Sequence, residues 1–140
     1  MKKNIFIISF IIFLSISFSF AQSNPCMEGV TYYSMEEALK EPLKVKVLDL
    51  AMQSPTKLTT LPASIGKLVN LECLDISFNR VSSLPPEIKN LKKLKILNLS
   101  GNQYLSKLPE VLKDIASLNE VNCTGIPQWS KTKCDAAKSM

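Results

Sequence analysis

One pattern of apolar residues recurs along the chain and constrains its fold more than any other feature. In the uninterrupted copy, residues 71–93, Leu74 and Ile76 alternate with polar residues as in a half-buried strand. Leu84 and Ile88 then follow at the spacing of one helical turn. Each copy of the pattern therefore predicts a strand, a bend and a short helical return.

Two further copies flank this one, within residues 45–68 and 94–115, and keep the same apolar positions. The shared pattern, L-x-x-L-x-L-x-x-N-x-L-x-x-L-P-x-x-I-x-x-L, resembles the leucine-rich repeat family, whose period is roughly 20–29 residues. The resemblance covers residues 39–125. It implies an α/β fold: a short right-handed solenoid with a four-stranded parallel sheet on its concave face, helical returns on its convex face and an N-terminal capping helix.

The repeat positions also predict where strands and segment boundaries fall. Strands are expected at residues 45–51, 72–77, 95–100 and 119–124. The expected segments are a signal peptide at 1–21, a lead-in with the capping helix at 22–44, the repeats at 45–125, and a C-terminal cap and tail at 126–140.

The first 21 residues have the pattern of a bacterial secretory signal peptide. Lys2 and Lys3 precede an apolar run over residues 5–20, and small residues lie just before Gln22, where cleavage is expected. An uncleaved anchor is the alternative, but such a run spans only roughly 24 Å as a helix, against ~30 Å of hydrocarbon core. We expect an exported protein, periplasmic or secreted, that meets a membrane only through this peptide before cleavage.

The charge balance argues against a nucleic-acid partner. Without Lys2 and Lys3 the chain keeps fifteen basic and twelve acidic side chains, a net charge of about +3. Most of these lysines fall at exposed positions of the helical returns and in the tail, as on a solvated convex face. A nucleic-acid site would gather basic residues with aromatic ones on a single surface.

A short helix is expected just before the first full repeat. Ser34 and Glu37 form a capping box, in which the serine hydroxyl accepts from the amide three residues on. Pro42 then stops the helix. Such a helix would cover the open apolar flank of the first strand, as terminal caps do in solenoids.

Four cysteines in an exported chain allow three fully paired connectivities. Cys123 lies at an inward position of the last strand, and Cys134 follows eleven residues later, beyond the last repeat. A covalent link would stabilise this end of the solenoid, so we expect these two cysteines to form a disulfide. Cys26 and Cys73 leave two alternatives open. They pair if the lead-in folds over the sheet, or both stay reduced.

The residue types do not favour catalysis. The chain has no histidine, which removes histidine-dependent triads, imidazole metal sites and the usual proton shuttle. Its four glycines form no phosphate-binding loop, and no cysteine pair has metal-ligand spacing. We expect no enzyme activity, no cofactor and no metal. A thiol-dependent enzyme or redox protein using Cys73 is a remote alternative, because Asp49 and Asp75 would disfavour the reactive thiolate.

The concave sheet face is the candidate binding site, because proteins of the leucine-rich repeat family use this face for partners. Its expected residues are Val47, Asp49, Met52, Cys73, Asp75, Ser77, Phe78, Ile96, Asn98, Ser100, Glu120 and Asn122. A column of Asp and Asn is also what solvated parallel strands tolerate, so both readings stay open for any single residue. The resemblance further implies that Asn79 and Asn102 form a structural ladder of side-chain amides at the bend.

These observations predict a non-catalytic module that binds an unidentified protein or peptide, and no nucleic acid. A structural or self-associating envelope protein is the alternative. Strands ~4.8 Å apart and residues rising ~3.3 Å give a flat patch on the order of 300 Å², well below the ~800 Å² per partner of a standard interface. We therefore expect weak binding, binding strengthened by several copies, or weak self-association.

Overall fold

The computed structural model describes residues 26, 29–53, 55–107 and 110–128. The expected signal peptide at 1–21, Cys134 and most of the expected C-terminal cap and tail lie outside these ranges. Within them, no helix is both long and apolar enough to cross a lipid bilayer.

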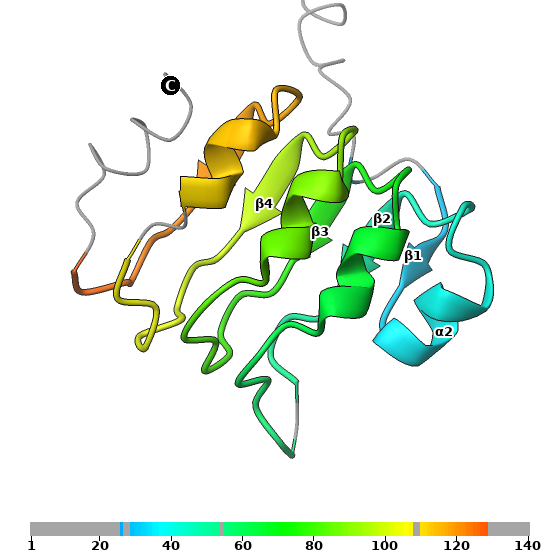
Figure 1. Cartoon of the computed structure of the whole chain (residues 1–140). Coiled ribbons are helices and arrows are strands. Elements are labelled where there is room, and N and C mark those ends of the chain that lie inside the picture. Colours follow the sequence, from blue (N-terminus) through cyan, green and yellow to red (C-terminus); the bar gives the residue numbers. More distant parts are fainter. Residues whose placement is uncertain (1–25, 27–28, 54, 108–109, 129–140) are drawn as a thin grey trace, which may run out of the picture.

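A parallel sheet forms one layer of the molecule, and short helices lie over one of its faces (Figure 1). The strands follow the chain order: β1 (Thr31–Tyr32), β2 (Val47–Asp49), β3 (Cys73–Asp75), β4 (Ile96–Asn98) and β5 (Glu120–Asn122). The connections contain α2 (Met35–Lys40) and the 3₁₀ helices η2 (Ala63–Lys67), η3 (Pro86–Asn90) and η4 (Glu110–Asp114). The expected solenoid is confirmed, with one strand and one 3₁₀ helix in each full repeat.

The described residues contain five strands rather than the expected four. The additional strand is β1, which pairs in parallel with β2 through Thr31 with Val47 and Tyr32 with Leu48. The sequence predicted an irregular lead-in there, because a strand of two residues is too short to show alternation. Together, β1 and α2 form a partial repeat at the N-terminal end.

The helix at this end begins as the sequence predicts. The Oγ of Ser34 accepts a hydrogen bond from the backbone N–H of Glu37 at 3.1 Å, which caps the first turn. Ala38 is fully buried, and Met35 and Leu39 pack against the core while partly exposed. The helix therefore covers apolar surface at the first repeat, as a solenoid cap must.

Leucine and isoleucine side chains fill the space between the sheet and the helices. Strand alternation turns Leu74 and Ile76 inward, and the 3₁₀ helix turns Ile88 toward them; all three are no more than 1% exposed. Each such side chain contributes roughly 1.5–3 kcal/mol through burial. This layer of repeated apolar side chains is what stabilises strands of only three residues.

The sheet register aligns equivalent positions of successive repeats. Val47, Cys73, Ile96 and Glu120 form one column across the strands, and Asp49, Asp75, Asn98 and Asn122 form another. Hydrogen bonds between repeats continue beyond the short strands, for example from the N–H of Met52 to the carbonyl of Ser77 at 3.0 Å. The sheet face opposite the helices, here called the inner face, is thus a regular grid of side chains.

Buried asparagines tie neighbouring repeats together at the bend. The Nδ2 of Asn102 donates to the carbonyls of Ile76 and Leu99 at 2.9 Å each, and its Oδ1 accepts from the N–H of Val81 at 2.9 Å. Asn79 makes the equivalent bonds one repeat earlier. Both asparagine side chains are themselves buried, and each hydrogen-bonds backbone groups of two neighbouring repeats.

Candidate functional site

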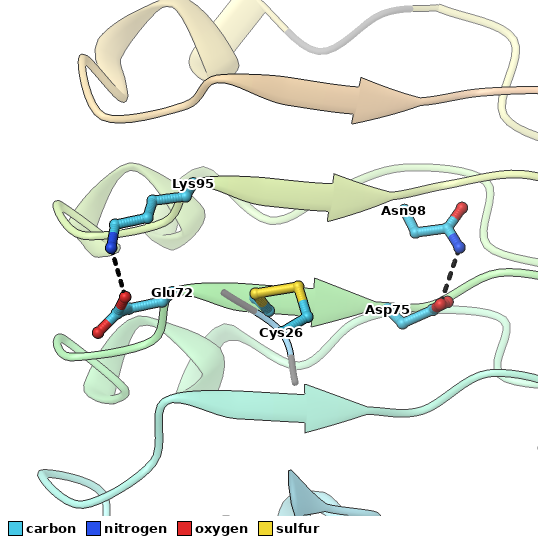
Figure 2. Close-up of a disulfide and its surroundings, with 6 residues drawn as sticks. Cys26, Glu72, Asp75, Lys95 and Asn98 are labelled. Atoms are coloured by element: carbon cyan, nitrogen blue, oxygen red, sulfur yellow. Dashed lines mark hydrogen bonds and ion pairs between the residues drawn. A yellow bond between two sulfur atoms is a disulfide. The ribbon is translucent and has the colours of Figure 1, made fainter. Parts of the chain in front are cut away.

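The second column of the inner face carries side chains that cap their own strands. The Oδ1 atoms of Asp49, Asp75, Asn98 and Asn122 each accept from the backbone N–H two residues on, at 2.9, 2.8, 3.2 and 3.1 Å. This Asx turn is a local role that only Asp or Asn performs well, which explains why the column contains no other residue type. The amide of Asn98 also donates to the Oδ2 of Asp75 at 2.8 Å (Figure 2).

Two carboxylates in this column keep their charge uncompensated. Among the described residues, neither Asp49 nor Asp75 belongs to any ion pair. At the start of β3, by contrast, Glu72 pairs with Lys95 at 2.6 Å (Figure 2). The hydrogen bond from Lys95 holds the pKa of Glu72 below its ordinary value. The negative charge of Glu72 is therefore balanced beside β3, whereas that of Asp49 and Asp75 is not.

A disulfide between Cys26 and Cys73 occupies the middle of the inner face (Figure 2). It ties the segment before β1 to the third strand of the sheet. Val47 lies between Thr31 and Cys73 in the register and is only 6% exposed, while Cys73 is 3% exposed. The sequence predicts that Val47 and Cys73 contact a partner, and both side chains are buried in this structure.

The same bond decides between the alternatives that the sequence left open for two cysteines. Cys26 and Cys73 are paired, so Cys73 carries no free thiol. This contradicts the hypothesis of a thiol-dependent site at Cys73, which needs a reactive thiolate.

Cys123 is also disulfide-bonded. Its expected partner, Cys134, lies outside the described residues, so that pairing stays a prediction.

The residue that follows each strand by three positions has a left-handed backbone. In the first two full repeats it is Met52, with φ 50°, and Phe78, with φ 55°. The next two repeats have Gly101 and Gly125 at this place, with φ 71° and 74°. Glycine adopts this conformation freely, whereas other residues lose about 1–2 kcal/mol. At Met52 and Phe78 the backbone is strained, although glycine could adopt the same conformation without strain. This is a reason to look for a function of the two side chains.

Both strained residues expose large apolar side chains. Met52 is 62% exposed and Phe78 is 55% exposed. The ring of Phe78 lies against Gly101, where an added Cβ would be 2.7 Å from the ring Cδ1. The carbonyl of Phe78 accepts a hydrogen bond from the Nζ of Lys57 at 2.7 Å, which fixes the local backbone further.

We expect Gly101→Ala to lower the free energy of unfolding by about 1–2 kcal/mol for the left-handed backbone alone, and by more because the new methyl group meets the Phe78 ring. Gly125→Ala is the matched control, since only backbone atoms lie near its Cβ position, at 3.8 Å or more. Urea unfolding of both variants checks this. Equal losses would mean that the ring moves aside without cost.

The predicted binding residues divide into three groups by exposure. Val47, Cys73, Ser77 and Ser100 are buried; Asp49, Asp75, Ile96 and Asn98 are half-buried; Met52, Phe78, Glu120 and Asn122 are exposed. We name the accessible group formed by Asp49, Asp75, Met52 and Phe78 the strand-end strip. Its left-handed positions were missed in the sequence, although Gly101 and Gly125 at the same repeat position were the available signal.

Comparison with models of protein families agrees with this architecture. A profile described as a leucine-rich repeat region matches residues 28–139. Among solved structures, a leucine-rich repeat protein from Leptospira interrogans is 26% identical, with a TM-score of 0.49. That match covers 69% of this chain and 35% of the other, so this chain spans well under half of that protein. No curated protein matches the sequence.

Proposed function

Because the chain belongs to the leucine-rich repeat family, we propose that it is a non-catalytic module that binds a protein or peptide through the accessible part of its inner face. The observation that carries this proposal is the pair Met52 and Phe78. Two bulky apolar side chains are held exposed on strained backbone, at a repeat position that elsewhere holds glycine. Neither side chain adds to the core, so their retention is best explained by contact with a partner.

The size of the accessible surface limits the kind of binding that we propose. With Val47, Cys73, Ser77 and Ser100 buried, less than the ~300 Å² of the flat inner face remains for a partner, against ~800 Å² in a standard interface. A short segment of a partner fits this area better than a folded surface does. We therefore propose modest affinity at a single site, which several copies could raise by avidity.

We further propose that the protein acts outside the cytoplasm. Disulfides persist in oxidising compartments, and the bond between Cys26 and Cys73 joins elements that a reduced chain would have to hold by packing alone. The expected signal peptide at residues 1–21 supports the same placement. Whether the compartment is periplasmic or extracellular does not affect the binding proposal.

The proposal is tested by affinity capture with variants of the inner face. We expect Phe78→Ala and Asp75→Lys to reduce the retention of specific partners by about tenfold or more, because truncated aromatic anchors and reversed charges weaken interfaces most. The measurement is quantitative mass spectrometry of proteins retained from extracts of the source organism. Lys89→Ala, an exposed change on η3, is the control and should leave retention unchanged.

Unchanged retention by both inner-face variants, with circular dichroism showing an intact fold, would remove this proposal. Light scattering of the wild-type protein separates it from the structural alternative. A concentration-dependent oligomer that Phe78→Ala abolishes would mean that the inner face binds another copy of the chain instead of a separate partner.

A further inference from the structure

The strand-end strip carries negative charge on a protein that is otherwise basic. The chain has a formal net charge of +5. Among its described acidic residues, Glu41, Glu72 and Glu110 are paired with lysines and the others are not. Of the unpaired acids, Asp49 and Asp75 are neighbours in the sheet register, and both are half-buried and thus partly shielded from water and salt. Charges in such positions are screened less than fully exposed ones.

Neutral hydrogen bonds hold these two carboxylates in place without cancelling their charge. Asp49 accepts from the N–H of Ala51 at 2.9 Å, and Asp75 accepts from the N–H of Ser77 at 2.8 Å and from the amide of Asn98 at 2.8 Å. A carboxylate has about four acceptor sites, so both groups can accept further bonds. They lie on adjacent strands, in register, at a spacing of ~4.8 Å. The pair is therefore oriented before any partner arrives, which lowers the entropic cost of binding.

An apolar surface begins three residues beyond each carboxylate, on the other side of the turn that the carboxylate caps. Met52 follows Asp49 and Phe78 follows Asp75, and both side chains are exposed. A methionine side chain adapts to different shapes, and the ring of a phenylalanine attracts cations as well as apolar groups. One partner segment can therefore reach the charged and the apolar part together.

We infer that the partner presents a cationic side chain next to an apolar one, the cation bound between Asp49 and Asp75 and the apolar group against Met52 and Phe78. The inference rests on the proposed function and adds the chemistry of the partner. Arginine suits the charged part best, because its planar fork can bond two carboxylates at once. In an extended segment, residues i and i+2 face the same side ~7 Å apart, so one segment can present a cationic and an apolar side chain to the same face.

One basic group already lies at the apolar end of the strip. Lys57 donates from its Nζ to the carbonyl oxygen of Phe78 at 2.7 Å and forms no ion pair with the aspartates. Lys57 thus leaves the two carboxylates unpaired. The strip is negatively charged at the ends of the strands, and a positive charge lies beyond Met52 and Phe78. The partner's cation is thus expected to point toward the strands and not toward the loop after Met52.

The probe for a direct test is a blocked pentapeptide of alanine, arginine, alanine, leucine and alanine, titrated into the ¹⁵N-labelled full chain at low salt. The amides of Ala51 and Ser77 donate to the two carboxylates, so their chemical shifts report on those groups directly. We expect saturable shifts of these amides and of Phe78. Replacing arginine by glutamate, or leucine by serine, should weaken binding about tenfold, as expected for losing a charge-assisted contact or an apolar anchor.

Asp49→Asn is the matched variant of the protein, because Asn98 and Asn122 make the same turn bond in later repeats. It should keep the fold and weaken binding of the arginine peptide about tenfold. Asp114→Asn on η4 removes one negative charge from the other side of the molecule and should change nothing.

Three results would overturn the inference in different ways. If the glutamate peptide bound the inner face as well as the arginine peptide did, the charge preference would be wrong while the proposed function stood. Shifts confined to η2, η3 and η4 would contradict both. If neither peptide shifted the inner-face amides while Phe78→Ala still abolished capture of a natural partner, the proposed function would stand and this chemistry would be rejected.

Discussion

Replacing Asn102 with alanine is expected to lower the free energy of unfolding by about 2–4 kcal/mol. Asn102 is 0% exposed, and its side chain bonds the carbonyls of Ile76 and Leu99 and the N–H of Val81. Alanine leaves the Val81 donor buried without a partner, which costs roughly 1–3 kcal/mol. The cavity left by the lost amide adds to this loss.

The measurement is the urea midpoint of Asn102→Ala at neutral pH. Gln103→Ala, one residue on and exposed, is the control and should shift stability by no more than about 0.5 kcal/mol. A loss below about 1 kcal/mol for Asn102→Ala would show that the backbone relaxes or that water enters, and that the amide ladder does not hold the repeats together.

The repeated part of the fold could be predicted from the sequence because the same pattern of apolar positions occurs three times. A single strand of three residues, such as Ile96–Asn98, carries too few positions to be recognised alone. Its alignment with Cys73–Asp75 in the preceding copy reveals both its place and which side chains face inward. Alignment of the repeats thus identifies strands that are too short to be recognised from the alternation of apolar residues within one strand.

The ends of the solenoid could not be predicted in the same way. β1 pairs with β2 over only Thr31 and Tyr32, and nothing in those residues repeats elsewhere in the chain. What places them in the sheet is tertiary: the exposed edge of β2 and the link from Cys26 to Cys73. Long-range contacts of this kind leave no local pattern, so the lead-in had the appearance of an irregular segment.

The positions of the predicted binding residues in the sheet follow from the sequence, but their exposure does not. Column positions such as Cys73 and Asp75 follow from the repeat, because strand alternation decides which of their side chains leave the core. Burial of Val47 on the same face does not follow from the repeat, since Val47 lies in the register between Cys73 and Thr31 of a strand that the repeat does not contain. The sequence could propose the disulfide between Cys26 and Cys73 as one of two alternatives but could not choose, because pairing depends on where the lead-in lies in space.

Replacing Cys26 and Cys73 together with alanine is expected to lower the free energy of unfolding by about 4 kcal/mol. The two residues are separated by 47 positions, and closing a loop of that size removes this much entropy from the unfolded chain. The loss is a large part of the ~5–15 kcal/mol that stabilises a typical domain. Urea unfolding of the double variant, without reductant, gives the value; a loss below about 1 kcal/mol would contradict the estimate.

Unfolding kinetics of the same variant show where the bond acts. If the bond acts by restricting the unfolded chain and the lead-in already meets the sheet in the folding transition state, folding slows and the unfolding rate stays close to that of the wild type. If the lead-in also holds the native face, unfolding becomes faster and the amide of Val47 exchanges its hydrogen sooner, because that residue then loses its cover. In the second case the disulfide also sets the limit of the binding surface: it confines a partner to the strand-end strip, and its removal should extend binding toward Val47 and Ile96.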